Sequence, residues 1–247
     1  RILGEYKKAI DFYQKSLLID QKSGNRTGEG ISLNNLGLAL YQSGIFPEAE
    51  KVLRQAISVL KSQRVRQQED NYKIDIFEKQ ARTYRTLQKV LIAQNKSTAA
   101  LEVAESGRAR ALVDLLASRL SVNDDTSTAP NINQIKQIAK AQNSTLVQYS
   151  IIYDYFKISG KQQYKQSELY IWVIKPTGEV TFRKADLKPL WQKENTILDE
   201  LVTTSRQSIG ARGRNFRGID VSFNPDAPTS SNKLKRLHEL LINPIAD

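Results

Sequence analysis

The feature that most constrains this chain is a pattern of small and large side chains that recurs after 40 residues. Residues 3–16 and residues 43–56 share the order glycine, aromatic, small, large, small. The matched positions are Gly4 with Gly44, Tyr6 with Phe46, Ala9 with Ala49, Tyr13 with Leu53, and Ser16 with Ala56. Small residues let two helices approach closely, and a large residue one turn later on the same face fills the space between them. The pattern therefore predicts antiparallel helix pairs over residues 1–120.

Glycine has two predicted roles in these helix pairs. Gly4 and Gly44 are expected where one helix ends and the chain turns, because glycine readily adopts the left-handed backbone conformation. Gly37 lies instead within an apolar stripe, which Leu33, Leu36 and Leu40 form at helical spacing. Glycine inside a helix lowers helix propensity, so we expect Gly37 to permit close packing of the partner helix.

This order of residues resembles the tetratricopeptide repeat, a helix–turn–helix unit with a usual period of about 34 residues. The resemblance implies a full repeat over residues 30–61 and a half-repeat over residues 1–20, with the extra residues in the polar, turn-rich segment 21–28. It implies an α-solenoid as the fold class of this part of the chain. Such arrays hold protein or peptide ligands along their inner, concave side.

A third, degenerate repeat is expected over residues 72–120. Ala100 takes the position of Ala49 at an offset of 51, with the added residues in the charged stretch 63–76. The turn glycine is absent, and Asn95 stands near its place. Asparagine also tolerates the left-handed conformation, so the helix–turn–helix form is retained in this prediction.

Aligning the repeats on Ala49 predicts which side chains of the first helix in each repeat lie on the inner side. These are Ile31, Asn34, Leu38, Tyr41 and Gln42 in the full repeat, and Arg82, Arg85, Lys89, Ile92 and Ala93 in the degenerate one. Three are cationic, which favours an acidic or carboxylate-bearing peptide. The candidate partner-binding residues are Asn34, Tyr41, Gln42, Arg82, Arg85 and Lys89. In the alternative interpretation these side chains are solvated, or are covered by strands of the following domain.

A second resemblance begins where the third repeat ends. Residues 99–116 resemble the last helix before a CHAT domain, a caspase-like domain associated with tetratricopeptide repeats. The signature residues are Glu105, Arg108, Ala109, Arg110, Leu112, Asp114, Leu115 and Leu116. The Glu105–Arg108 and Arg110–Asp114 spacings also suit helical ion pairs. The strings 146–149 and 169–178 resemble the opening hairpin of CHAT domains, and residues 240–247 resemble the segment before their central strands.

The remaining elements follow from composition and periodicity. The sequence predicts a linker at 121–133, a helix at 133–142, strands at 145–156, 169–174 and 180–183 with a polar hairpin loop at 157–168, helices at 187–206 and 234–246, and a loop at 207–231. The resemblance assigns residues 134–247 to the N-terminal portion of an α/β, caspase-like CHAT domain.

In the CHAT family, a His and a Cys at strand ends form a peptidase dyad. This chain has no Cys, and its single His, His238, is interpreted as an exposed helix residue beside Glu239. We therefore predict no catalytic residue in this chain. The resemblance implies a bacterial parent protein, typical of cyanobacteria, whose catalytic part lies outside these residues. The parent would be a cysteine peptidase or a relative that has lost activity.

Composition excludes several other functions. The absence of Cys excludes disulfides and thiolate ligands, and one His excludes a multi-His metal site, so we predict neither a metal nor a cofactor. No run of 18 apolar residues exists, so no membrane span is predicted and a cytoplasmic location is expected. The chain also lacks Met, and both of its ends are expected to be truncated.

The net charge of +11 is spread along the chain. Residues 1–120 hold 20 Lys and Arg against 13 Asp and Glu, and residues 121–247 hold 17 against 13. Nucleic-acid binding favours a concentrated patch, and the Arg- and Gly-rich segment 210–218 is interpreted as a surface loop rather than an RNA-binding element. The leading interpretation is a protein–protein interaction module coupled to a CHAT peptidase domain. The alternatives are a non-catalytic scaffold with a degenerate CHAT domain, or a nucleic-acid-binding repeat protein.

Overall fold

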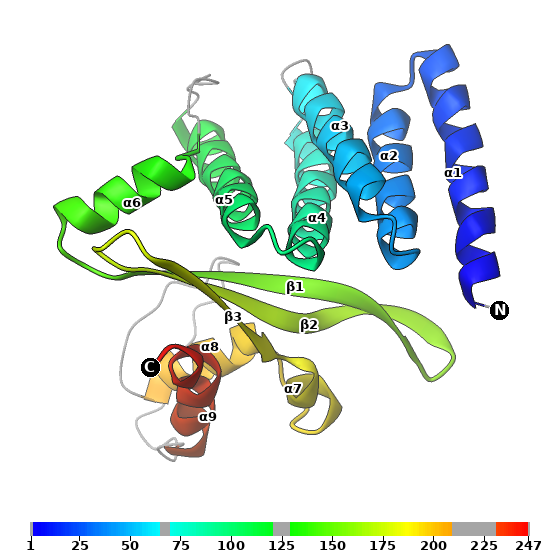
Figure 1. Cartoon of the computed structure of the whole chain (residues 1–247). Helices are drawn as coiled ribbons and strands as arrows, with labels where there is room; N and C mark the ends of the chain where they lie inside the picture. The colour runs from blue at the N-terminus through cyan, green and yellow to red at the C-terminus, as the bar shows by residue number, and fades with distance from the viewer. Residues whose placement is uncertain (1, 65–69, 121–128, 209–230, 247) are drawn as a thin grey trace. The chain divides into compact units, whose positions relative to one another are not determined.

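The computed structural model describes residues 2–64, 70–120, 129–208 and 231–246 (Figure 1). The chain divides into two compact units. The first comprises residues 1–144 with 176–178, and the second comprises residues 145–175 with 179–247. The predicted linker lies partly outside the described residues, and the Arg- and Gly-rich segment 210–218 lies wholly outside them. The predicted residue limits of the domains stay predictions.

The first unit is helical, as the repeat pattern predicts. Its helices are α1 (Ile2–Ser23), α2 (Arg26–Gln42), α3 (Phe46–Arg64), α4 (Asp70–Ala93), α5 (Ser97–Leu120) and α6 (Ile132–Ala141). Consecutive helices from α1 to α5 run antiparallel and pack on one another, and α2 also packs on α4 (Figure 1). Between Ile31 and Leu116, the described residues contain no strand.

Two helix pairs turn with the same backbone geometry. Gly44 follows α2 with φ of 77°, and Asn95 follows α4 with φ of 60°. In each turn the next amide donates to a carbonyl five residues back: Ile45 N to Leu40 O at 2.9 Å, and Lys96 N to Leu91 O at 2.9 Å. This closure satisfies carbonyls that the helix end leaves unpaired. The predictions for Gly44 and Asn95 are confirmed.

The prediction for Gly4 is wrong. Helix α1 begins at Ile2, so Gly4 lies inside the helix and not at a turn. Its neighbours Leu3 and Glu5 are good helix formers, and one glycine costs a helix only about 1 kcal/mol. The turn between α1 and α2 contains Gly24, whose φ is 69°.

The α2–α3 pair is packed at the positions that recur after 40 residues. Ala49, Leu53 and Ala56 of α3 are fully buried. A Cβ atom at Gly37 would lie 2.5 Å from Leu53 Cγ, a distance that side chains do not tolerate without a shift. Gly37 therefore permits the close approach predicted for it. Gly30 does the same two turns earlier on the same face of α2, where a Cβ would lie 2.6 Å from Leu60 Cδ2.

The α4–α5 pair has the degenerate form of the same packing. Ala100, which takes the position of Ala49, and Leu87 are buried, and Tyr84 is half-buried. Gly107 of α5 lies against Tyr84, and a Cβ atom there would be 3.3 Å from Tyr84 Cγ. Helix α6 follows with a reciprocal cap between Asn131 and Gln134.

The second unit is built on a three-stranded antiparallel sheet in the order β1-β2-β3. The strands are β1 (Leu146–Ile158), β2 (Lys161–Ile174) and β3 (Val180–Asp186). The predicted hairpin loop at 157–168 is wrong, because β1 and β2 remain paired up to a two-residue turn at Ser159-Gly160. Both turn residues have positive φ, 50° and 79°, which matches the twist of the two strands. The polar residues with which β2 begins at Lys161 suit a two-stranded ribbon whose two faces are both exposed to solvent.

The helices of the second unit differ from prediction in their limits. The predicted helix at 187–206 is two helices, α7 (Lys188–Gln192) and α8 (Leu198–Ser208). Asn195 between them adopts a positive φ of 49°, and the Glu200 carboxylate accepts from Ile197 N at 3.3 Å, which starts α8. Helix α9 (Ser231–Leu241) ends before the predicted limit, and a 3₁₀ turn, η1 (Asn243–Ile245), follows because Pro244 cannot continue the hydrogen-bond ladder.

One face of β2 forms the core of the second unit with the helices that follow. Its buried members are Leu169, Ile171, Leu187, Leu190, Leu198, Leu201 and Leu240. Leu237 and Leu241 of α9 pack against this core while partly exposed. Tyr149 of β1 donates its hydroxyl to Leu241 O at 2.8 Å, which ties α9 to the sheet.

Candidate partner-binding surface

Helices α2 and α4 are the first helices of successive repeats, and they contact each other directly. At this contact the Nζ atom of Lys89 lies 5.0 Å from the centre of the Tyr41 ring. Lys89 is only 7% exposed. A cation over an aromatic face is stabilised more strongly when water is excluded. The structure therefore brings two of the predicted residues together across α2 and α4.

Asn34 lies two turns before Tyr41 on α2 and is 8% exposed. Its Nδ2 donates to Asn35 Oδ1 at 3.3 Å. Its Oδ1 is buried and accepts no hydrogen bond from the described protein residues. Leaving a buried acceptor unpaired costs about 1–3 kcal/mol. A ligand that donates a hydrogen bond to Asn34 would recover this cost.

Arg82 and Arg85 lie on the same side of α4 as Lys89, since residues three and seven apart share a helical face. Arg82 is exposed, Arg85 is half-buried and Lys89 is buried. Cationic charge therefore runs along one face of α4 from solvent into the contact with α2. This arrangement suits an anionic group that enters from the exposed end.

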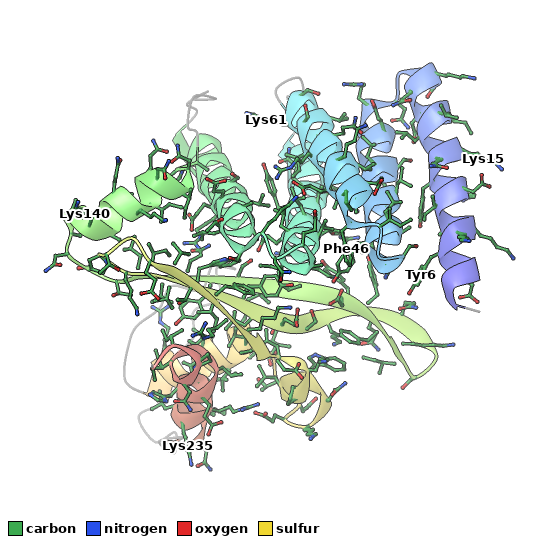
Figure 2. The ribbon with its side chains drawn as sticks, in the orientation of Figure 1. Tyr6, Lys15, Phe46, Lys61, Lys140 and Lys235 are labelled. Carbon is green, nitrogen blue, oxygen red and sulfur yellow. The ribbon has the colours of Figure 1, made fainter. Side chains whose placement is uncertain are left out.

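Gln42 lies on a neighbouring surface. With Leu38 it lines an open groove between α1 and α2, of about 260 Å³. The groove is lined by Glu5, Tyr6, Ala9 and Tyr13 of α1 and by Asn35, Leu38, Ala39 and Gln42 of α2. Tyr6 and Phe46 lie at the same end of the helical array, and Lys15 points away from α2 on the other side of α1 (Figure 2). The predicted site residues are thus divided between two adjacent surfaces of α2.

Sequence reasoning missed the α1 side of this groove. Tyr6 and Tyr13 were assigned to packing because they match Phe46 and Leu53 at the offset of 40. Leu53 is fully buried, whereas Tyr6 and Tyr13 are half-buried and line the groove. The sequence signal for the α1 side of the groove is a tyrosine at each of two positions where the next repeat has a purely apolar side chain.

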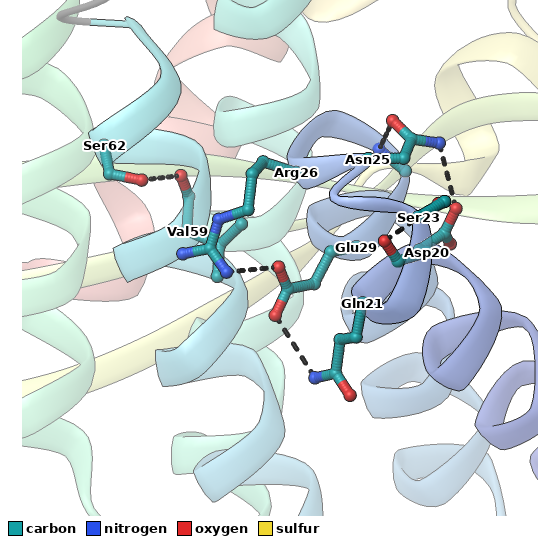
Figure 3. Close-up of polar contacts among 9 residues, drawn as sticks. Asp20, Gln21, Ser23, Asn25, Arg26, Glu29, Val59 and Ser62 are labelled. Atoms are coloured by element: carbon teal, nitrogen blue, oxygen red, sulfur yellow. Dashed lines mark hydrogen bonds and ion pairs between the residues drawn. The ribbon is translucent and has the colours of Figure 1, made fainter.

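A polar network holds α1 beside α2 (Figure 3). Asn25 caps α2 by accepting from Gly28 N at 3.0 Å, and its Nδ2 donates to Asp20 Oδ1 at 2.9 Å. Glu29, which is 5% exposed, accepts from Gln21 Nε2 at 3.2 Å and pairs with Arg26. These contacts join the end of α1 to the first turn of α2 and hold the two helices together at the end opposite the groove.

A second network holds α3 to the turn between α4 and α5. Glu50 accepts from Lys96 Nζ at 2.7 Å, Arg54 Nη2 at 2.8 Å and Gln94 Nε2 at 3.0 Å. Partial burial opposes ionisation of Glu50, but the hydrogen bonds from Lys96, Arg54 and Gln94 together outweigh it, and the pKa of Glu50 is lowered. The ionised carboxylate therefore links the two helix pairs that carry the inner face.

The structure also bears on several other residues singled out in the sequence. His238 is exposed on α9, as interpreted from its neighbours. Arg108 pairs with Glu105 at 3.3 Å, whereas the side chains of the predicted Arg110–Asp114 pair lie outside the described residues. In the described ranges, no group of three His, Asp or Glu side chains is arranged to hold a metal ion. Of the helices described, none is both long and apolar enough to traverse a bilayer.

Comparison with known proteins supports the helical repeats. Residues 1–62 match the tetratricopeptide repeat family. The chain is 29% identical over 194 residues to mouse tetratricopeptide repeat protein 28 and 27% identical over 206 residues to the human protein of that name. These matches cover 76% and 81% of this chain but 8% of each relative. No solved structure matches.

The matches to the mouse and human proteins are not confined to the helices. The first unit makes up less than two thirds of the chain, so an alignment over 76% of it includes part of the second unit as well. The chain spans only a small part of the length of these relatives. The match to the tetratricopeptide repeat family covers α1, α2 and most of α3, and α4 and α5 have the same turn geometry beyond the matched residues.

Proposed function

Proceeding from tetratricopeptide repeats over residues 1–62, we propose that the helical unit binds a peptide segment of a partner protein across α2 and α4. The ligand is acidic or ends in a free carboxylate. The observation that carries this proposal is the cationic face of α4, which Arg82, Arg85 and Lys89 form at the contact with Tyr41 of α2.

The chemistry of these side chains defines the ligand. A guanidinium binds a carboxylate through two parallel hydrogen bonds, which a lysine cannot do, so Arg82 and Arg85 select a planar anion. Asn34 Oδ1 would accept from a peptide N–H. Lys89 is held over Tyr41 and adds positive charge at a site from which water is largely excluded.

The second unit belongs to the same proposal in a broader form. We propose that residues 134–247 are the N-terminal portion of a CHAT domain, joined by a linker at 121–133, and that ligand binding by the helical unit is coupled to it. The antiparallel sheet with flanking helices is compatible with this assignment, and the match to the relatives extends into this part of the chain. A scaffold with a degenerate CHAT domain is the alternative, and a cytoplasmic location is part of the proposal.

Fluorescence anisotropy tests the ligand assignment. The probes are a labelled Glu-rich peptide with a free C-terminal carboxylate, its C-terminal amide, and a Gln-rich peptide of equal length. The Arg82→Ala, Arg85→Ala double variant should bind the Glu-rich peptide about thirtyfold more weakly, which corresponds to roughly 2 kcal/mol.

A charge-matched control separates local contacts from the overall positive charge. The Lys51→Ala, Lys61→Ala variant removes two exposed cations from α3. It should keep most of the affinity for the Glu-rich peptide. Equal losses in the two double variants, or tighter binding of the Gln-rich peptide, would contradict the assignment.

A further inference from the structure

We infer that the groove between α1 and α2 binds a cationic side chain, Arg or Lys, of the same peptide whose acidic part lies on α4. This inference rests on the proposed function, because it places a second anchor of that ligand. It also gives the ligand a direction, with a basic residue over α1 and an acidic one over α4.

The lining of the groove is rich in acceptors and aromatic faces. Glu5 supplies a carboxylate, Tyr6 and Tyr13 supply two rings, and Asn35 and Gln42 supply amide oxygens. Among the residues that the structure describes, no Lys or Arg lines the groove, although Lys7 and Lys8 are exposed nearby on α1. In a chain with a net charge of +11, a groove whose described lining has one carboxylate and no cation differs from its surroundings.

The spacing of the lining residues shapes the groove for one extended side chain. Tyr6 and Tyr13 are seven residues apart on α1, which separates them by about 10 Å along the helix axis. Ala9 lies between them on α1, Ala39 of α2 also lines the groove, and the short side chains of both alanines leave space in it. The volume of about 260 Å³ is below the range of roughly 300–1,000 Å³ typical of small-molecule sites. A guanidinium or ammonium group between the rings would make cation–π contacts, with Glu5 as its counter-ion.

The groove adjoins the α4 side of the proposed site through α2 itself. Leu38 and Gln42 lie one turn apart and line the groove, while Asn34 and Tyr41 lie on the next stripe of the same helix, toward α4. A ligand crossing α2 therefore meets acceptor groups first and cations second. Reversing the ligand would bring its basic residue to Arg82 and Arg85, and like charges repel. This repulsion determines the direction in which the ligand binds across α2.

A double-mutant cycle tests the inference on the full chain. The probes are labelled Ser/Gly peptides that carry a pair of Glu and one Arg at varied spacing, on either side of the pair, with Arg replaced by Gln in the matched set. The protein variant is Glu5→Gln, which keeps the shape of an exposed side chain. Its control is Glu48→Gln, an exposed carboxylate in the first turn of α3 that is not part of the groove lining.

At the best spacing, removing either Arg from the peptide or the charge from Glu5 should weaken binding about fivefold, or about 1 kcal/mol. Removing both should weaken it no further, and the control should bind like the unaltered chain. Additive losses, or no loss with Glu5→Gln, would overturn the groove assignment. If Arg82→Ala, Arg85→Ala still weakens binding in that case, the proposed function stands without this anchor. If none of the peptides binds, both fail together.

Discussion

The two complete helix pairs of the first unit, α2–α3 and α4–α5, keep the same turn but differ on the faces that the turn brings together. Gly44 and Asn95 both adopt positive φ and both are followed by an amide that donates to a carbonyl five residues back. Ala49 and Ala100 are both fully buried. The turn and the buried alanine that follows it are therefore the features that define both helix pairs, although other residues differ between them.

The interior contact of each pair differs. At the offset of 51, Gly37 of α2 corresponds to Gln88 of α4. Gly37 lets Leu53 approach closely, whereas Gln88 is 3% exposed and its Oε1 accepts no hydrogen bond from the described residues. At this position the first pair is closely packed through a glycine, and the second holds a buried amide oxygen that has no donor among the described residues.

The inner faces differ as well. Ile31, Asn34 and Leu38 of α2 correspond to Arg82, Arg85 and Lys89 of α4 at the same offset. These positions differ in charge between the two pairs while the turns are retained, so the turn geometry does not depend on their charge. The comparison therefore separates residues that set the turn from residues that differ between the repeats and can define a ligand.

The largest expected difference lies at the close helix contact. Gly37→Ala should lower the free energy of unfolding by about 1–3 kcal/mol, because the new Cβ would lie 2.5 Å from Leu53 Cγ. Gly107→Ala, whose Cβ would be 3.3 Å from Tyr84 Cγ, should be near neutral, since the gain in helix propensity offsets the tighter contact. Urea titrations followed by circular dichroism compare the two. Equal effects would remove the distinction between the pairs.

Gln88→Leu should raise the stability of the helical unit by about 1 kcal/mol. The substitution removes a buried acceptor that has no donor and keeps most of the side-chain volume. Thermal unfolding measures the change, and Leu87→Gln, which places an amide at a buried apolar position, is a control expected to destabilise. A loss of stability in Gln88→Leu would mean that the glutamine makes contacts that stabilise α4–α5.

The link between the pairs should depend on pH through Glu50. Its pKa is lower in the folded chain, so its contribution is fully present above the ordinary Glu pKa of about 4.3 and is lost as the pH falls through the lower folded value. Glu50→Gln should therefore cost roughly 1 kcal/mol at neutral pH and little at the acid end. Unfolding titrations across this window test it. Parallel curves for the two proteins would show that Glu50 does not titrate differently on folding.

Sequence reasoning reached the helix pairs because their determinants are local. Gly44, Asn95 and Ala49 act through a turn or a single helix contact, and each has one residue type that suits its conformation. The ribbon of β1 and β2 differs from the predicted loop because the polar residues from Lys161 to Lys165 suit either a loop or a strand with both faces exposed to solvent. Only Gly160, at the turn, carried a signal for the hairpin.

The candidate site was predictable to the same degree. Periodicity placed Asn34, Tyr41 and Lys89 on helix faces, and the structure brings Tyr41 and Lys89 together. Periodicity does not give the exposed fraction of each side chain, because that fraction depends on segments distant in the sequence. The groove between α1 and α2 was missed because a half-buried tyrosine and a core tyrosine look alike in a sequence.

The most direct experiment replaces the inner-face residues of α4 with those at the equivalent positions of α2. The variant Arg82→Ile, Arg85→Asn, Lys89→Leu gives α4 the three residues that α2 has at the equivalent positions. We predict that the variant folds, because the turns at Gly44 and Asn95 and the buried Ala49 and Ala100 are retained, and that loss of the Lys89–Tyr41 contact lowers its free energy of unfolding by about 1–2 kcal/mol. Its affinity for the Glu-rich peptide should fall at least thirtyfold in the anisotropy titration. Unchanged affinity in a folded variant would contradict the claim that this face of α4 holds the ligand.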